Sequence, residues 1–309
     1  MPSNSPTIDS GAGDKSGRLN VVATPIGNRG DITLRALDTL AEVDLIAAED
    51  TRHTRRLLTH YAIRNSMISL HEHNENQRTG TLVQRLRGGE SIALVSDAGT
   101  PTLSDPGYRL IKEAIASGIR IVPIPGASAV LASLCASGLP TDAHVFMGFL
   151  PRKEGKRQKI LQSLTAEKKT IIFYESPKRI KVLISDLINT LGDRRGVLSR
   201  EMTKRHEEFI RGDLSQLLDV LADRPEIKGE CTLVVEGGAD QEIPAADALR
   251  EEIIQGLHRD GIRLSSLVKN IAERYGLPRK QIYDQALKIK SLQDVMERDH
   301  VAFKGKKQL

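Results

Sequence analysis

The sequence is poor in the residues on which several classes of protein depend. It has two cysteines in 309 residues, 3% aromatic residues and no tryptophan. Cys135 and Cys231 are far apart and form no Cys-x-x-Cys pair, so the sequence indicates neither a disulfide framework nor a zinc site. A reducing, cytoplasmic location is therefore expected. So few aromatic side chains argue against a protein that binds nucleic acid mainly by stacking. No apolar run approaches the length that a bilayer requires, which argues against a transmembrane segment.

Several short catalytic motifs are also missing. The first predicted strand is not followed by Gly-x-Gly-x-x-Gly, which weakens a nicotinamide-binding interpretation. Neither Gly13-Asp14-Lys15 nor Gly155-Lys156 has the context of a phosphate-binding Walker loop. His71 and His73 lack the spacing of a His-Glu-x-x-His zinc helix, so no metal is predicted. The absence of Gly-x-Ser-x-Gly argues against a hydrolase.

What the sequence does contain is a basic, globular composition. Its net charge is +5, its pI is about 9.1 and 39% of its residues are hydrophobic. The positive charge favours an anionic partner, with nucleic acid ahead of a membrane surface. The length predicts two or three domains.

Short apolar runs alternate with amphipathic segments between residues 18 and 126. This alternation predicts a mostly parallel sheet with helices on its faces, and it gathers the loops that follow the strands at one edge. A helix is expected from about Thr33 and another after Gly107. The strands are predicted at Leu19–Ala23, Leu45–Ala48, Met67–Leu70, Ile92–Val95 and Ile119–Ile124.

The loop after the Ile92–Val95 run has the composition of a ligand-binding loop. Residues 96–107 contain two aspartates, two glycines and two prolines. In an open α/β sheet, ligands bind at the carboxyl ends of strands, where glycine permits close approach and aspartate accepts hydrogen bonds from a ribose or an amine. An ordinary strand-to-helix turn would use the same residues, so both interpretations stay open.

Residues 127–241 predict a second α/β domain with more antiparallel, α+β character. A helix of small residues is expected over 128–136 and an apolar helix over 180–191. The basic segment 151–157 is either a solvated surface loop or a phosphate contact. The strands are predicted at Val145–Phe149, Thr170–Tyr174, Val197–Glu201, His206–Arg211 and Cys231–Glu236.

The remaining segments are a helical domain and two tails. Residues 242–295 predict three helices, at Ala248–Leu257, Leu264–Tyr275 and Arg279–Ile289. Gly276-Leu277-Pro278 joins the last two in a helix-turn-helix pattern, which suits either nucleic-acid contact or a small helical bundle. Residues 1–17 are expected to be a disordered tail and not a signal peptide, and residues 296–309 a basic tail.

Residues 19–290 resemble the ribosomal RNA small subunit methyltransferase I family. The motifs that carry the resemblance occur in the family's order: Thr24-Pro25-Ile26-Gly27-Asn28, Ala48-Glu49-Asp50-Thr51-Arg52-His53, His73-Asn74-Glu75, Ser96-Asp97-Ala98-Gly99-Thr100-Pro101, Ser104-Asp105-Pro106-Gly107, Pro123-Ile124-Pro125-Gly126, Gly148-Phe149-Leu150-Pro151, Phe173-Tyr174-Glu175-Ser176 and Arg200-Glu201-Met202-Thr203-Lys204.

The resemblance implies a fold, a cofactor and a substrate. The fold would be two consecutive α/β domains of the tetrapyrrole methylase type with a cofactor cleft between them, followed by the helical domain. S-adenosyl-L-methionine would be the cofactor, and the protein would be a homodimer. Its activity would be methylation of the ribose 2′-hydroxyl of one cytidine in 16S ribosomal RNA near the decoding site.

The resemblance and the basic loops also indicate site residues. Cofactor contacts are expected at Pro25, Ile26, Gly27, Asp97, Ala98, Gly99, Thr100, Ser128, Ala129, Tyr174 and Cys231. Contacts with RNA are expected at Arg29, His73, Arg152, Lys153, Arg179, Lys204, Arg279 and Lys280.

Methyl transfer to a hydroxyl needs a base or a cation beside the oxygen. The charged candidates at strand ends are Glu49, Asp50, Arg52, His53 and Glu175. Asp50 or Glu175 is favoured as base or orienter and Arg52 as a phosphate contact, although each could instead be a helix cap or a surface ion pair. Two other functions stay open. One is methylation of a tetrapyrrole or a protein side chain, and the other is a nucleic-acid-binding sensor that binds the cofactor without transferring a methyl group.

Overall fold

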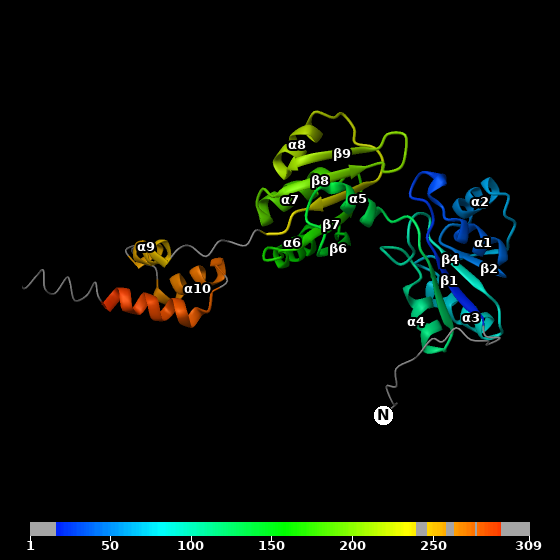
Figure 1. Ribbon diagram of the computed structural model, residues 1–309, viewed down its shortest axis with the longest axis horizontal. Helices are drawn as coiled ribbons and strands as arrows, with labels where there is room; N and C mark the ends of the chain where they lie inside the picture. The colour runs from blue at the N-terminus through cyan, green and yellow to red at the C-terminus, as the bar shows by residue number, and fades with distance from the viewer. Residues whose placement is uncertain (1–16, 239–245, 258–262, 276, 292–309) are drawn as a thin grey trace, which may run out of the picture. The chain divides into compact units, whose positions relative to one another are not determined.

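The computed structural model describes residues 17–238, 246–257, 263–275 and 277–291. The chain divides into two units, one ending at Gly238 and one beginning at Ala239. The larger unit holds two five-stranded sheets and the smaller unit is helical (Figure 1). Of the predicted tails, residues 1–17 and 296–309, only Gly17 is described, and its N–H donates to Leu86 O at 3.0 Å. The predicted arrangement of two α/β halves followed by helices is confirmed.

The first sheet is entirely parallel, in the order β3-β2-β4-β1-β5. Its strands carry side chains into two different cores because successive residues of a strand point to opposite faces. Leu45 and Ala47 pack into one hydrophobic cluster, whereas Ile46 and Ala48 pack into another. Helices therefore cover both faces, as the unbroken apolar runs predict. The strands are β1 (Arg18–Val22), β2 (Leu45–Ala48), β3 (Met67–Ser69), β4 (Ile92–Val95) and β5 (Arg120–Ile124).

Two helices of this half were not predicted from the sequence. They are α2 (Thr51–His60) and α3 (Glu75–Arg87). In α2 only Thr54 and Leu58 are buried and most other positions are polar, so the helix has no apolar stripe to detect. Asp50 caps α2, its carboxylate accepting from the Arg52 N–H at 2.8 Å. The other helices are η1 (Arg29–Asp31), α1 (Leu34–Glu42) and α4 (Tyr108–Ala116).

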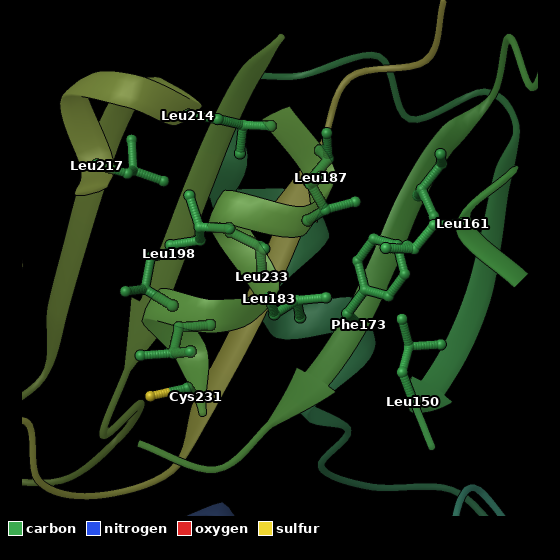
Figure 2. Close-up of a cluster of buried hydrophobic side chains, with 14 of the residues drawn as sticks. Leu150, Leu161, Phe173, Leu183, Leu187, Leu198, Leu214, Leu217, Cys231 and Leu233 are labelled. Atoms are coloured by element: carbon green, nitrogen blue, oxygen red, sulfur yellow. The ribbon is translucent and has the colours of Figure 1, made fainter. Parts of the chain in front are cut away.

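The second sheet has the order β6-β7-β10-β8-β9. Only β6 and β7 are parallel, and the other pairs are antiparallel, which confirms the predicted α+β character. One face packs on a large apolar core built around Phe173, Leu183 and Leu233 (Figure 2). The strands are β6 (His144–Phe149), β7 (Thr170–Glu175), β8 (Arg195–Arg200), β9 (Glu208–Asp213) and β10 (Cys231–Val235).

The basic segment 151–157 is not one solvated loop, contrary to one of the two interpretations. Helix α6 (Glu154–Ser163) begins within it, and Arg157 is only 7% exposed. The Arg157 Nε lies 2.6 Å from Asp186 Oδ2, on α7 (Ile180–Leu191). Arg157 therefore joins two helices and is not available to a phosphate. The other helices of this half are α5 (Ala129–Ser137) and α8 (Leu214–Ala222), of which α8 was not predicted.

The smaller unit contains the three predicted helices. They are α9 (Ala246–Leu257), α10 (Leu264–Tyr275) and a third over residues 279–291. Ile253, Ile271 and Ile282, one from each helix, share a single core, as a helix-turn-helix unit requires. Gly276, in the predicted turn, lies outside the described residues. No helix in the described part of the chain combines the length and the apolar character needed to cross a membrane.

Glu75, at the start of α3, holds the beginning of α4 in place. Its side chain is buried, and Oε1 accepts from the N–H groups of Gly107 at 3.1 Å and Arg109 at 2.8 Å. Gly107 has φ 117°, and a Cβ there would lie 2.6 Å from Leu94 Cδ2, so this turn needs glycine. Glu75 thereby fixes the end of the loop that follows β4.

We expect Glu75→Ala to destabilise the protein by about 2–3 kcal/mol, because it leaves donors unpaired that cost roughly 1–3 kcal/mol each when buried. Urea unfolding followed by circular dichroism measures the loss. The matched control is Glu72→Ala, since Glu72 is exposed and its loss should change the free energy of unfolding by less than about 0.5 kcal/mol. Equal unfolding midpoints for the two variants would contradict this anchoring role.

Candidate active site

A cavity of about 400 Å³ is lined by residues of both sheets of the larger unit. This volume lies within the range of small-molecule sites, about 300–1,000 Å³. One side is formed by residues that follow the first-sheet strands: Ile26 after β1, Glu49 after β2, and Asp97–Thr100 after β4. They meet because the carboxyl ends of parallel strands share one edge. The rest of the lining is Leu103, Ser104, Asp105, Ser128, Ala129, Phe149, Tyr174, Glu175, Ser176, Pro177, Gly229, Glu230, Cys231 and Thr232.

The loops after β1 and β4 are bonded to each other through their backbones. Thr24 N–H donates to Gly99 O at 2.9 Å, and Gly99 N–H donates to Thr24 O at 3.0 Å. Gly99 has φ 80°, and a Cβ there would lie 3.3 Å from the Ile26 side chain. Glycine at this position lets the two loops approach and leaves backbone at the cavity surface.

Asp97 joins the ends of β2 and β4. Its Oδ1 accepts from the Asp50 N–H at 3.0 Å, and its own N–H donates to Glu49 Oε2 at 3.2 Å. Burial raises the pKa of Glu49, an effect that the Asp97 N–H opposes and the neighbouring Asp97 and Asp50 charges reinforce. These crossed bonds fix two carboxylates, Glu49 and Asp97, at the cavity wall.

A third carboxyl, Asp105, lies in the same wall. Burial is the main cause that raises its pKa to about 6. A hydrogen bond from Ser96 opposes the rise, and the charges of Glu49 and Asp97 add to it. Burial and the Asp105 charge in turn raise the pKa of Tyr174 to about 12. The cavity thus contains a carboxyl group able to gain or lose a proton near neutral pH.

The opposite wall, from the second sheet, combines the aromatic rings of Tyr174 and Phe149 with Cys231 and the carboxylates of Glu175 and Glu230. The Tyr174 ring lies 4.8 Å from Phe146 and 5.5 Å from Phe149, between ring centroids. Burial raises the pKa of the Cys231 thiol to about 12, so Cys231 is a neutral wall residue and not a thiolate nucleophile.

Glu175 is buried at the edge of this wall. Its Oε1 accepts from Ser176 N–H at 2.8 Å and Oγ at 3.3 Å. The Arg179 Nη2 lies 2.9 Å from Oε2 but is not aligned to donate to it, and it donates instead to Leu150 O at 2.9 Å. Ser176 therefore holds Oε1, whereas Oε2 accepts no hydrogen bond and lies beside the Arg179 guanidinium.

Comparison with known proteins assigns the family. Residues 18–218 match the model of the Tetrapyrrole (Corrin/Porphyrin) Methylases. The chain is 46% identical to a ribosomal RNA small subunit methyltransferase I from Synechocystis, over 89% of this chain and 99% of that protein. It is 44% identical to the enzyme of the same name from Halalkalibacterium halodurans, over 88% and 95%. The chain belongs to the ribosomal RNA small subunit methyltransferase I family.

Solved structures of the wider methylase group share the fold. A uroporphyrin-III C-methyl transferase from Thermus thermophilus, complexed with S-adenyl homocysteine, superposes with a TM-score of 0.51. The two are 18% identical, and the match covers 71% of this chain and 97% of that one. At this identity the likeness establishes the two-sheet fold alone.

With the family established, most residues predicted to contact its cofactor lie at the cavity. Pro25 and Gly27 do not line it but border an adjoining groove, which shares Ile26, Asp97, Ala98 and Glu230 with the cavity. A Cβ at Gly27 would lie 2.5 Å from Lys204 Cγ, so only glycine allows this close approach. The predicted residues that line the cavity are Ile26, Asp97, Ala98, Gly99, Thr100, Ser128, Ala129, Tyr174 and Cys231.

The predicted catalytic residues do not all lie together. Glu49 and Glu175 line the cavity and His53 lines the adjoining groove. Asp50 lines neither. Its carboxylate caps α2 and pairs with Arg52 at 2.7 Å, which holds the pKa of Asp50 well below its ordinary value.

The predicted RNA contacts are spread over several elements. Arg29 and Lys204 line the groove, and Lys204 pairs with Glu201 at 2.9 Å and Glu230 at 3.2 Å. His73 faces His71, with ring centroids 6.1 Å apart. Arg152 and Lys153 are exposed immediately before α6. Arg179 contacts Glu175. Arg279 and Lys280 begin the last helix of the smaller unit.

Several cavity residues were missed although signals for them were present. Asp105 and Ser104 stand in the motif Ser104-Asp105-Pro106-Gly107, and Ser176 follows Glu175 in another motif. Glu230 directly precedes Cys231. Among the described residues, no group of three histidine, cysteine, aspartate or glutamate side chains is placed to hold a metal ion.

Proposed function

We propose that the protein transfers a methyl group from S-adenosyl-L-methionine to the ribose 2′-hydroxyl of a cytidine in 16S ribosomal RNA, near the decoding site. The observation that carries the proposal is the cavity between the two sheets, in which carboxylates after the first-sheet strands face the aromatic rings of Tyr174 and Phe149. The relatives that match most of the chain are named ribosomal RNA small subunit methyltransferases. Assembly as a cytoplasmic homodimer belongs to the same proposal.

The cavity residues fit the chemistry of this cofactor. S-adenosylmethionine carries a sulfonium and an ammonium group, which suit a wall that contains Glu49, Asp97 and Asp105. Its adenine is a flat apolar ring, which suits the wall of Tyr174 and Phe149. When bound, the cofactor supplies an electrophilic methyl group on positively charged sulfur.

The protein's own residues must hold the hydroxyl in line and take its proton. We assign the proton to the Asp105 carboxylate, which lines the cavity and whose pKa is raised toward neutrality. Asp50 is a poorer acceptor because Arg52 lowers its pKa. Glu175 is bonded to Ser176 through Oε1 and paired with Arg179 through Oε2, so we assign it an orienting role. Glu49 and Asp50 then act as positioning residues that hold Asp97.

The activity is tested by incubating the protein with methyl-labelled S-adenosylmethionine and small ribosomal subunits. We expect label in 16S RNA, and nucleoside mass spectrometry should identify it as 2′-O-methylcytidine. Label in a methylated base, in ribosomal protein or in an added tetrapyrrole would contradict the proposal. Binding of the cofactor without transfer to any substrate would favour the sensor instead.

A further inference from the structure

Helix α2 presents a row of arginines beside the cavity. Arg52, Arg55 and Arg56 are exposed, whereas Thr54 and Leu58 face the core. Residues three or four apart on a helix are neighbours on its surface, so the three guanidinium groups share one side. With Thr51 and Thr59 they line a shallow depression. We call Arg52, Arg55 and Arg56 the arginine face.

Much of this positive charge is not neutralised by the protein. Arg52 pairs with Asp50, but within the described residues neither Arg55 nor Arg56 has an acidic partner. Adjacent like charges on one helix repel each other, which costs stability unless an anion binds between them. The arginine face is therefore suited to a ligand that carries several negative charges.

The arginine face connects with the cavity through the adjoining groove. Arg56 lines both the depression on α2 and the groove. The groove in turn shares Ile26, Asp97, Ala98 and Glu230 with the cavity. Side chains thus line a continuous path from the surface of α2 to the place where the methyl group would be held.

The groove itself has donors fixed in position. Arg29 Nη1 lies 3.1 Å from His60 Nδ1, and the Tyr61 hydroxyl donates to Arg29 O at 2.5 Å. Both contacts tie Arg29 to the end of α2. His53, one turn from Arg56, also lines the groove. A loop and a helix thus present cationic and imidazole groups toward the same space.

We propose that the arginine face, continued by the groove of Arg29 and His53, binds the sugar–phosphate backbone of the RNA strand whose ribose enters the cavity. This inference rests on the proposed function, because it places the strand relative to the methyl-transfer site. Guanidinium groups bind phosphate with paired hydrogen bonds, and a row of them follows a backbone without requiring a base sequence. A flexible single strand also lets the target ribose turn inward while its neighbouring phosphates stay on α2.

The test is a double variant, Arg55→Gln with Arg56→Gln, which leaves the Asp50–Arg52 cap intact. We expect the Kd for the target RNA segment at about 0.15 M salt to rise at least tenfold. The slope of log affinity against log salt should fall in magnitude by about 1.4, since each phosphate contact on a single strand contributes roughly 0.7. Affinity for S-adenosylmethionine, measured by calorimetry, should change less than twofold, and kcat at saturating subunits should be retained.

Two further variants keep the result interpretable. Arg78→Gln with Lys112→Gln removes the same charge from exposed positions on α3 and α4 that line none of these surfaces, and it should leave the salt slope unchanged. Arg55→Lys with Arg56→Lys keeps the charge and should keep the salt slope, while the affinity recovers only in part because an ammonium group cannot form the paired bonds.

Four outcomes would overturn the inference. The first is an unchanged salt slope in the Arg55 and Arg56 variant, and the second is an equal loss of RNA affinity in the Arg78 and Lys112 control. The third is a loss of cofactor affinity in the Arg55 and Arg56 variant that matches its loss of RNA affinity. The fourth is that this variant loses binding to anionic vesicles but not to RNA. The matching cofactor loss would assign the groove to the cofactor's carboxylate. Failure of the proposed function is a separate result, since the unaltered protein would then place no label in RNA.

Discussion

Asp97→Leu should lose binding of S-adenosylmethionine by at least about 100-fold, a loss of roughly 2.7 kcal/mol or more. The substitution removes a negative charge from the cavity wall, where a cationic ligand is held in a poorly hydrated site. It also leaves the Asp50 N–H without the acceptor that now lies 3.0 Å away. Isothermal titration calorimetry on the purified variant measures the affinity.

A conservative variant separates charge from structure. Asp97→Asn keeps an oxygen for the Asp50 N–H and removes only the charge, so its affinity should lie between those of the unaltered protein and Asp97→Leu. Asp142→Leu, at an exposed position away from the cavity, controls for an added apolar side chain. Calorimetric affinities for Asp97→Leu within threefold of the unaltered protein would remove Asp97 from the cofactor site.

Asp105→Asn should lower kcat by about 10²–10⁴-fold, the usual contribution of a general base. Cofactor affinity should fall less than in Asp97→Leu, because the charges of Glu49 and Asp97 remain in the cavity wall. The pH dependence follows from the raised pKa of about 6. Below that pH Asp105 holds a proton and cannot accept another, so kcat/KM of the unaltered protein should fall about tenfold per pH unit. Glu49, Asp97 and Tyr174 are the other titratable groups that face Asp105. The fall in kcat/KM below about pH 6 is assigned to Asp105, so the Asp105→Asn variant should no longer show it.

The profile is measured by single-turnover methyl transfer between pH 5 and pH 8. The control is Asp38→Asn on the exposed side of α1, which should show the kcat of the unaltered protein and the same fall in kcat/KM below about pH 6. If Asp105→Asn still shows the fall in kcat/KM below about pH 6 and has an unchanged kcat, Asp105 does not take the proton of the hydroxyl. Glu49 then becomes the next group to test.

The parallel sheet and the loop after β4 could be predicted from the sequence because their signals are local. Four consecutive apolar residues, Ile92–Val95, are followed by glycine and aspartate, and the structure places that loop at the cavity. The helices α2 and α3 could not be found in this way. In α2 only Thr54 and Leu58 are buried, and in α3 the buried side begins with the polar residues Glu75 and Thr79, so apolar residues mark only the second half of that helix.

The properties of individual side chains depended on distant partners. Arg157 stands in a basic segment that is typical of a solvated loop, but Asp186, 29 residues later, draws it into the interior. Asp105 was visible within a motif, yet its raised pKa comes from burial together with the charges of Asp97, at the other end of its own loop, and Glu49, on the loop after β2. Such environments are set by tertiary contacts, and no spacing in the sequence records them.

One backbone bond has a consequence for how the two ligands influence each other. The N–H that Asp97 accepts belongs to Asp50, the residue whose side chain begins α2. The wall of the cavity and the first turn of the arginine face are therefore mechanically linked across a single residue. If filling the cavity shifts Asp97, the end of α2 moves with it, and by reciprocity a strand lying on that helix then changes the affinity of the cavity by the same factor. Variants at either end should accordingly be assayed against both ligands.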